Sequence, residues 1–212
     1  TNGSTQNSTK FTVDRIRATG DVELYGGEIV LTGGITTSAT SGMGIVVKAT
    51  GDINVSSGTA VSRNPMSVTG TNSTAPVTLW SNADATGGGS ISIGNYVDVA
   101  TRGADIVLGG SAAASDTSPT THADGVNTGT CDGIRLGSSA VANGSVAINS
   151  TGGNITLRGK NTLNSASCVG IKVFSGTAIN SGAGSVLIDA VSVAPTGTSN
   201  GHGIELNWLG SF

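Results

Sequence analysis

The sequence GIRL at residues 133–136 returns 37 residues later as GIKV at residues 170–173. Two segments of the same type lie between them, GSVAI at 144–148 and GNITL at 153–157. Each segment alternates apolar with polar residues, which is the period of a half-buried β-strand, and Gly, Asn and Ser supply turn residues in the gaps. Three strands followed by a return to the first predict one turn of a solenoid.

Segments of the same kind recur along most of the chain. They lie at 11–13, 21–24, 28–31, 44–47, 51–55, 66–68, 77–79, 90–93, 105–108, 185–188, 191–193 and 203–206. Loops without apolar alternation separate them, notably 33–43 and 109–132, and the longest loops precede the G-I-x-[LV] segments. A fixed order of segments with insertions at one point is typical of stacked coils. It favours a solenoid over an antiparallel sandwich, which also has many short strands.

The expected fold is all-β, a parallel β-helix of about four to five turns with long loops on one side. Glycine every few residues disfavours helix, because each glycine inside a helix costs about 1 kcal/mol. We expect residues 1–212 to form a single β-helix segment. The final residues, WLGSF at 208–212, show no polar capping pattern, which predicts a fragment of a much longer repetitive protein.

The composition narrows the possible functions. Charged residues make up 11% of the chain and aromatic residues 3%, and 34 of the 212 residues are Gly. Ordinary domains have about 25% charged residues, so this surface is built from Ser, Thr, Asn and Gly. The net charge of −3 shows no electrostatic signature of nucleic-acid binding. The sequence contains no run of 18 apolar residues, so it predicts no membrane-spanning helix.

Stacked coils place equivalent residues in columns, with neighbouring strands about 4.8 Å apart. We expect one inward column of Ile45, Val77, Ile134, Ile171 and Ile204 and a second of Val47, Leu79, Leu136, Val173 and Leu206. Cys131 and Cys168 share the 37-residue offset, so their Cα atoms should lie near 5 Å, within disulfide range. A disulfide would imply an oxidising compartment; two free thiols are the alternative.

Ionisable side chains are sparse. The two histidines are His122 and His202, and Asp116, Asp124 and Asp132 lie near the first of them. A metal or acid–base site at His122 with Asp124 is conceivable, but a solvated polar loop is the stronger interpretation. Catalysis needs converging ionisable groups, whereas most outward positions carry residues unsuited to it, namely Asn54, Ser92, Ala147, Thr156 and Leu187. We predict no enzyme activity, no cofactor and no metal.

Charged and aromatic residues gather at outward positions of the first strand of successive turns. The candidate strip consists of Lys48, Trp80, Arg135, Lys172 and Phe174. One interpretation is a surface that contacts a partner or a glycan, since aromatic rings and fixed charges are common interface anchors. The other, which we favour, is a face that keeps the rod soluble, with the two aromatic rings covered by long loops.

The segments at 153–157, 51–55 and 103–110 resemble those of bacterial filamentous haemagglutinin-like exoproteins, very long proteins of the two-partner secretion type. The similarity extends over nearly all of residues 11–206. It implies a right-handed parallel β-helix, secretion across the outer membrane to the cell surface, and roles in adhesion, biofilm or surface filaments. It supplies no functional residues, because the shaft of such proteins is structural.

We therefore expect a structural and adhesive module of a secreted filament. Its partners would be neighbouring repeats or filament subunits, and surface glycans. Two alternatives stay open, a carbohydrate-active β-helix enzyme and a phage tail-spike-type fibre. The enzyme would need a cluster of acidic or basic residues in one groove, and the fibre would show contacts around a threefold axis.

Overall fold

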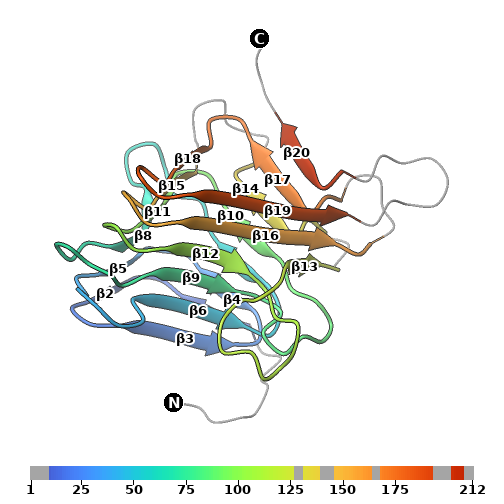
Figure 1. Ribbon diagram of the computed structural model, residues 1–212, viewed down its shortest axis with the longest axis horizontal. Helices are drawn as coiled ribbons and strands as arrows, with labels where there is room; N and C mark the ends of the chain where they lie inside the picture. Colours follow the sequence, from blue (N-terminus) through green and yellow to red (C-terminus); the bar gives the residue numbers. More distant parts are fainter. Residues whose placement is uncertain (1–9, 127–130, 139–145, 164–167, 193–201, 208–212) are drawn as a thin grey trace.

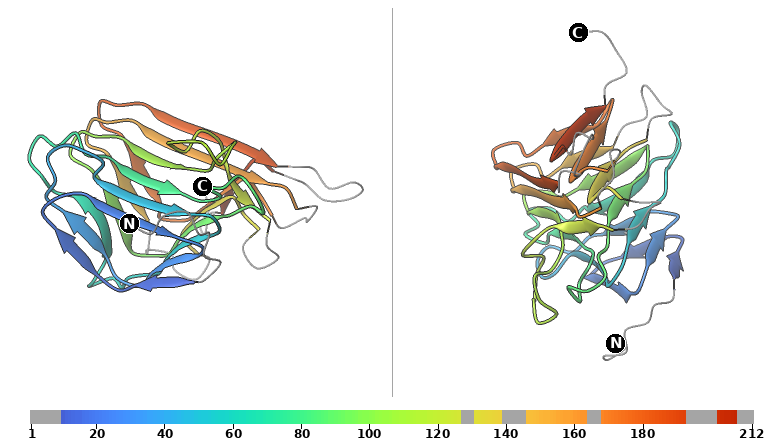
Figure 2. Two further views of the ribbon diagram at one scale, coloured as in Figure 1. Left: turned by 90° about the horizontal axis from the view of Figure 1, so that it is seen from below. Right: turned by 90° about the vertical axis from the view of Figure 1, so that its right-hand side faces the viewer.

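The computed structural model describes residues 10–126, 131–138, 146–163, 168–192 and 202–207. All regular structure in these ranges is β, arranged as 20 strands (Figure 1). Long apolar helices of the kind that cross a membrane are absent from the same ranges. Figure 2 shows the chain winding upward from its N-terminal to its C-terminal coils. The prediction of an all-β chain is confirmed.

Three parallel sheets form the faces of the solenoid. The first sheet contains β1 (Phe11–Val13), β4 (Ile29–Leu31), β7 (Ile53–Val55), β10 (Ile91–Ile93), β14 (Ile134–Leu136), β17 (Ile171–Phe174) and β20 (Ile204–Asn207). The second contains β2 (Ile16–Ala18), β5 (Ile35–Thr37), β8 (Asn64–Val68), β11 (Val97–Ala100), β15 (Ala147–Asn149) and β18 (Ala178–Asn180). The third contains β3 (Val22–Gly26), β6 (Ile45–Ala49), β9 (Val77–Trp80), β12 (Ile106–Gly109), β16 (Ile155–Asn161) and β19 (Val186–Ser192), with β13 (Ala123–Gly125) beside the end of β16.

Each coil contributes one strand to each sheet, and each strand pairs in parallel with its equivalents above and below. The parallel β-helix predicted from the sequence is therefore confirmed. The six strands of the second sheet mark six complete coils, and β20 begins a seventh. Because parallel pairing at every level joins residues far apart in sequence, the backbone hydrogen bonds themselves hold the coils together.

The number of coils exceeds the four to five expected, because the sequence conceals most of the second sheet. Strands β2, β5, β11 and β18 fell outside the predicted segments, and residues 33–43, expected to be a loop, contain β5. Three of these strands are only three residues long. Such short strands offer one or two inward positions, too few to show an alternating pattern.

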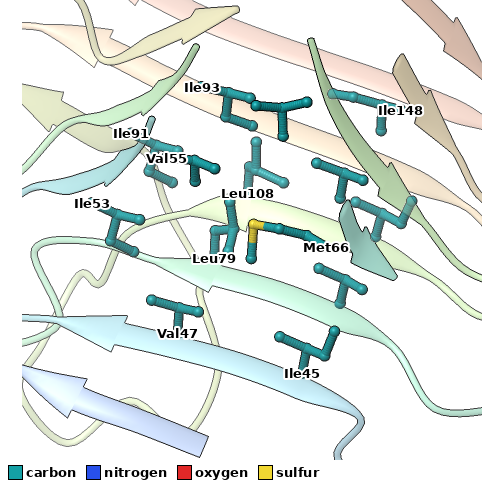
Figure 3. Packing of buried hydrophobic residues seen from close by; sticks show 14 of the residues in the cluster. Ile45, Val47, Ile53, Val55, Met66, Leu79, Ile91, Ile93, Leu108 and Ile148 are labelled. Carbon is teal, nitrogen blue, oxygen red and sulfur yellow. The ribbon is translucent and has the colours of Figure 1, made fainter. Parts of the chain in front are cut away.

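The inward residues form continuous ladders, but not the two columns predicted. Ile45 pairs with Val77 in the third sheet, whereas in the first sheet Ile134 pairs with Ile171, which in turn pairs with Ile204. The prediction joined these two ladders wrongly, because strands of both sheets have the same G-I-x-[LV] appearance. Val47 with Leu79, and Leu136 with Val173 and Leu206, divide in the same way. Figure 3 shows aliphatic side chains from the sheets pointing into one interior.

The longest connections of the upper coils join the third sheet to the first, as expected. They include residues 81–90, between β9 and β10, and residues 110–133, between β12 and β14. The lower coils differ, because the connections at 56–63 and 69–76 lie at the other two corners. Residues 137–146, between β14 and β15, form a connection as long as residues 81–90 from the first sheet to the second, so long connections are not confined to one side of the stack.

The predicted disulfide is present. Cys131 and Cys168 are bonded with their Cα atoms 5.2 Å apart. A second link lies one residue further on, where the Val169 amide donates to Asp132 Oδ1 at 3.1 Å. Together these links fix the segments that lead into β14 and β17. The disulfide indicates an oxidising environment, while secretion to a bacterial cell surface stays a prediction.

Candidate ligand-binding groove

A polar column crosses the outer face of the first sheet. Because side chains alternate across a strand, the middle residue of each short strand points outward while its neighbours point into the core. The register aligns these middle residues from coil to coil as Thr12, Val30, Asn54, Ser92, Arg135, Lys172 and Glu205. The column changes from neutral polar residues in the central coils to charged residues in the upper ones.

A groove of about 290 Å³ lies on this face across β7, β10 and β14. Its floor consists of Asn54, Ser92 and Arg135, and its walls include Ser57 and Ser138 on one side and Ser90 and Asp132 on the other. At the centre of the groove, only residues 94–96 connect β10 to β11. The lining of the groove includes the side chains of five serines and one asparagine among twelve residues.

Hydrogen bonds between coils fix the first wall. The Asn95 amide N–H donates to Ser57 Oγ at 3.0 Å, and Asn95 Nδ2 donates to Ser138 Oγ at 2.8 Å. The Ser138 amide returns a bond to Asn95 Oδ1 at 2.9 Å. Gly94 permits this arrangement, because a Cβ atom there would lie 2.5 Å from the Ser57 nitrogen. One polar residue from each of three coils thus forms a continuous hydrogen-bonded wall.

Of two nearby carboxylates, only Asp132 lines the opposite wall; Asp52 is outside the lining and holds Ser90 in that wall. Asp52 Oδ1 accepts from both the amide and the hydroxyl of Ser90, at 2.7 and 2.9 Å. Asp132 is buried at the level of β14. Burial raises the pKa of Asp132, because it disfavours the charged carboxylate, although the Val169 amide and the nearby Lys172 and Arg135 act in the opposite direction.

Arg135 closes the upper end of the groove beside an aromatic ring. Its guanidinium carbon lies 4.9 Å from the centroid of Phe174, and Lys172 Nζ lies 5.8 Å from the same centroid. Lys172 also forms an ion pair with Glu205 at 3.1 Å. Arg135 donates to the Gly137 carbonyl at 3.4 Å, and within the described residues it has no carboxylate partner at ion-pair distance.

The other two residues of the predicted strip lie on a different face. Lys48 and Trp80 pair in register in the third sheet, and Lys48 Nζ lies 3.7 Å from the Trp80 ring centroid. The five residues therefore do not form one strip, and that part of the prediction is wrong. The register divides them into a Lys48–Trp80 cluster and an Arg135–Lys172–Phe174 cluster. Whether either cluster contacts a partner stays a prediction.

A loop covers the Lys48–Trp80 cluster. Trp80 is 3% exposed, and its Nε1 donates to Ser111 Oγ at 2.7 Å. Burial lowers the pKa of Lys48, partly offset by the negative charge of Asp116 in the same loop. The interpretation favoured from the sequence placed long loops over both Trp80 and Phe174; the loop that contains Ser111 lies over Trp80. Phe174 is buried too, although it lies beside the open groove.

The loop is stabilised from within by Asp116. This carboxylate accepts hydrogen bonds from the Thr120 hydroxyl and from the amides of Ala113 and Ala112. The Thr120 hydroxyl is the largest cause of a lowered pKa for Asp116, followed by the two amides. The lid over Trp80 therefore depends on a charged Asp116.

The two members of the conceivable His122–Asp124 site have different partners. His122 Nε2 lies 3.1 Å from Asp189 Oδ1, across the surface of β19. Asp124 binds Lys160 Nζ at 2.9 Å and accepts from the Thr162 hydroxyl. His202 is exposed just before β20. Throughout the described ranges, no three His, Cys, Asp or Glu side chains gather closely enough to hold a metal ion.

Comparison with known proteins finds no match to a family model, to a curated protein or to a solved structure. The resemblance to filamentous haemagglutinin-like exoproteins consequently stays a prediction. Sequence reasoning named Asn54 and Ser92 as outward residues but gave them no role, and it missed Ser57, Ser90, Asn95 and Ser138 as groove walls. For the first wall, the available signal was a serine or asparagine two residues after the end of β7, β10 and β14.

Proposed function

We propose that this chain is a structural and adhesive module of a secreted cell-surface or extracellular filament. The main support is the C-terminal face of the stack, where the inward columns continue beyond the covered core. On β19 and β20 the inward residues Val186, Ile188, Ile204 and Leu206 are 37–72% exposed. Their equivalents one coil below, Ile155, Leu157 and Ile171, are fully buried.

Such a face favours a further layer of β-structure. It combines exposed aliphatic side chains with the unpaired backbone groups of edge strands, which readily pair with another strand. A coil of the same parent chain or of a neighbouring filament subunit would satisfy both. The repeat architecture requires neighbours in this way, because each coil buries its apolar face only against the next.

Two other observations are consistent with a place outside the cell. The disulfide requires an oxidising compartment to persist. The surface carries few charges and many hydroxyl and amide groups, and a preformed polar groove crosses the first sheet. An adhesive module would use such a groove to bind a partner, whereas a purely structural shaft would not need one.

The groove favours binding over hydrolysis. Glycosidases use two carboxyl groups on opposite sides of the bond that is cleaved. Among the residues that line the groove, Asp132 is the one carboxylic acid. Surface glycans and neighbouring filament subunits are therefore the partners that we propose, with no catalytic step.

End-on association can be tested by sedimentation velocity. The wild-type chain should self-associate with rising concentration, and an Ile188→Lys/Leu206→Lys variant should stay monomeric, because both charges fall on the open face. Val61→Lys serves as control, since Val61 is 97% exposed in a side loop and the same chemical change there should leave association intact. Electron micrographs should show rods of uniform width.

Two outcomes would contradict the filament proposal. A wild-type chain that stays monomeric at high concentration would show that the exposed end recruits no further layer. A discrete trimer whose formation is unaffected by the two lysines would instead favour the tail-spike alternative. Circular dichroism of each variant establishes that the β-fold is retained.

A further inference from the structure

We infer that the groove across β7, β10 and β14 is a binding site for a neutral glycan. This inference names the ligand class of the proposed adhesive module, and its biological role rests on that proposal. Its physical basis is separate from the open end of the stack. It follows from four properties of the groove: free hydrogen-bonding capacity, balanced charge, size and rigidity.

The floor of the groove has unused hydrogen-bonding groups. Within the described part of the chain, the hydroxyls of Ser56 and Ser92 bond to no protein atom. Ser57 and Ser138 accept bonds from Asn95 through their oxygens, which leaves their hydroxyl protons able to donate outward. Closely spaced groups that both donate and accept match the hydroxyls of a sugar ring.

The charges of the groove favour a neutral ligand. Arg135 is the one cation of the lining and Asp132 the one acid, and they lie within three residues on the same coil. The rest of the lining is uncharged. An anionic sugar would gain from Arg135 but lie close to Asp132, so the pair offers no net attraction for a charged ring. Each can instead bond to the hydroxyls of a neutral one.

The size of the groove fits a short stretch of sugar. Its volume of about 290 Å³ lies at the lower end of the roughly 300–1,000 Å³ typical of small-molecule sites. It spans the strands of three coils, β7, β10 and β14. A short stretch of an oligosaccharide can lie across these strands, with Arg135 at the upper end.

The groove is rigid before any ligand arrives. Its floor is built on β-strands, and bonds between coils hold Ser57, Asn95 and Ser138 on one side and Ser90 with Asp52 on the other. Binding would therefore cost little ordering of the protein. Phe174 adds no stacking platform, because Arg135 and Lys172 lie over its ring.

Saturation-transfer NMR followed by titration tests the inference on the monomeric Ile188→Lys/Leu206→Lys chain. The probes are tetrasaccharides of glucose, galactose, mannose and N-acetylglucosamine, with a galacturonate tetrasaccharide as the charged comparison. We expect at least one neutral probe to bind. Ser92→Phe, which fills the middle of the floor, should lower its affinity by about tenfold or more.

A matched control is Thr156→Phe, an outward position on β16 in the third sheet, which should leave binding unchanged. Asn54→Phe gives a second groove variant on the neighbouring coil if Ser92→Phe fails to fold. The inference is overturned if no neutral probe binds, if galacturonate alone binds, or if both groove variants bind like the parent. Because the parent chain is already monomeric, these outcomes are independent of the test of end-on association.

Discussion

Two clusters in this molecule pair a cation with an aromatic ring, and they differ in what lies over them. On the third sheet, Lys48 lies over Trp80, and the loop that contains Ser111 covers the ring. On the first sheet, Arg135 and Lys172 lie over Phe174 at the end of an open groove. The same pairing of side-chain types secures a loop in one place and borders a candidate binding site in the other.

The difference comes from the connections. The long connection between β12 and β14 folds back over the third sheet, whereas three residues connect β10 to β11 beside the first. The three residues between β10 and β11 are too few to fold back over the first sheet, and that sheet carries the groove.

The largest expected effect is on the free energy of unfolding, and it differs between Trp80 and Phe174. Trp80→Ala should lower the free energy of unfolding by about 4–5 kcal/mol, and Phe174→Ala by about 3 kcal/mol. Trp80 has the larger buried side chain and also holds the loop through Ser111. Urea unfolding followed by circular dichroism measures both. A larger loss for Phe174→Ala would show that the groove side, not the covered side, is the more tightly packed.

The disulfide should stabilise the groove side of the molecule selectively. Replacing Cys131 and Cys168 together by serine reopens a 37-residue loop and should cost about 2–4 kcal/mol. Unfolding with and without a thiol reductant measures the effect, and the double variant should be insensitive to reductant. Fluorescence of Trp80 in the native state, with Trp208→Phe as background, should not change, because Cys131 lies at the opposite end of the β12–β14 connection from Ser111. A changed spectrum would show that the Lys48–Trp80 cluster is coupled to the side of the molecule that contains the disulfide.

Asp132→Asn should produce a smaller gain in stability on the groove side. Burial raises the pKa of Asp132 in the folded chain, so the folded state binds the proton more tightly than the unfolded state. The contribution of Asp132 to stability is then most favourable below the unfolded pKa of about 3.9 and is lost as pH rises through the folded pKa. The variant, neutral throughout, should melt higher at pH 7 but equally at pH 3. Equal melting at both would mean that the carboxylate is fully solvated.

The smallest effect is expected at Asp116, on the covered side. Hydrogen bonds from Thr120, Ala113 and Ala112 lower its pKa, so the stabilisation it gives the loop is complete above about pH 4 and is lost as pH falls through the lowered value. Acid titration should therefore shift Trp80 emission to the red before global unfolding. In Asp116→Asn this early step should be missing, and its persistence would mean that other groups hold the loop.

Much of the solenoid could be predicted from residues alone, and the groove could not. The segments that contain β14, β16 and β17 predicted strands because each alternates apolar and polar residues. The segment of β14 also recurs 37 residues later as the segment of β17. The short strands of the second sheet gave no such signal, and the count of coils was too low. Ser57, Asn95 and Ser138 are unremarkable in a chain rich in such residues, and they become a wall only when three coils align them.

The sequence by itself determined that the chain is a stack of parallel β-coils and that Cys131 and Cys168 would meet, because both follow from a repeat whose equivalent positions must coincide. The tertiary structure alone decided which columns belong to which sheet. Strands of the first and third sheets look alike in sequence, since each needs only two inward aliphatic residues. The sequence of a connection does not indicate which sheet the next strand joins. Coil-to-coil register therefore separated Lys48 and Trp80 from Arg135, Lys172 and Phe174, and left one face open.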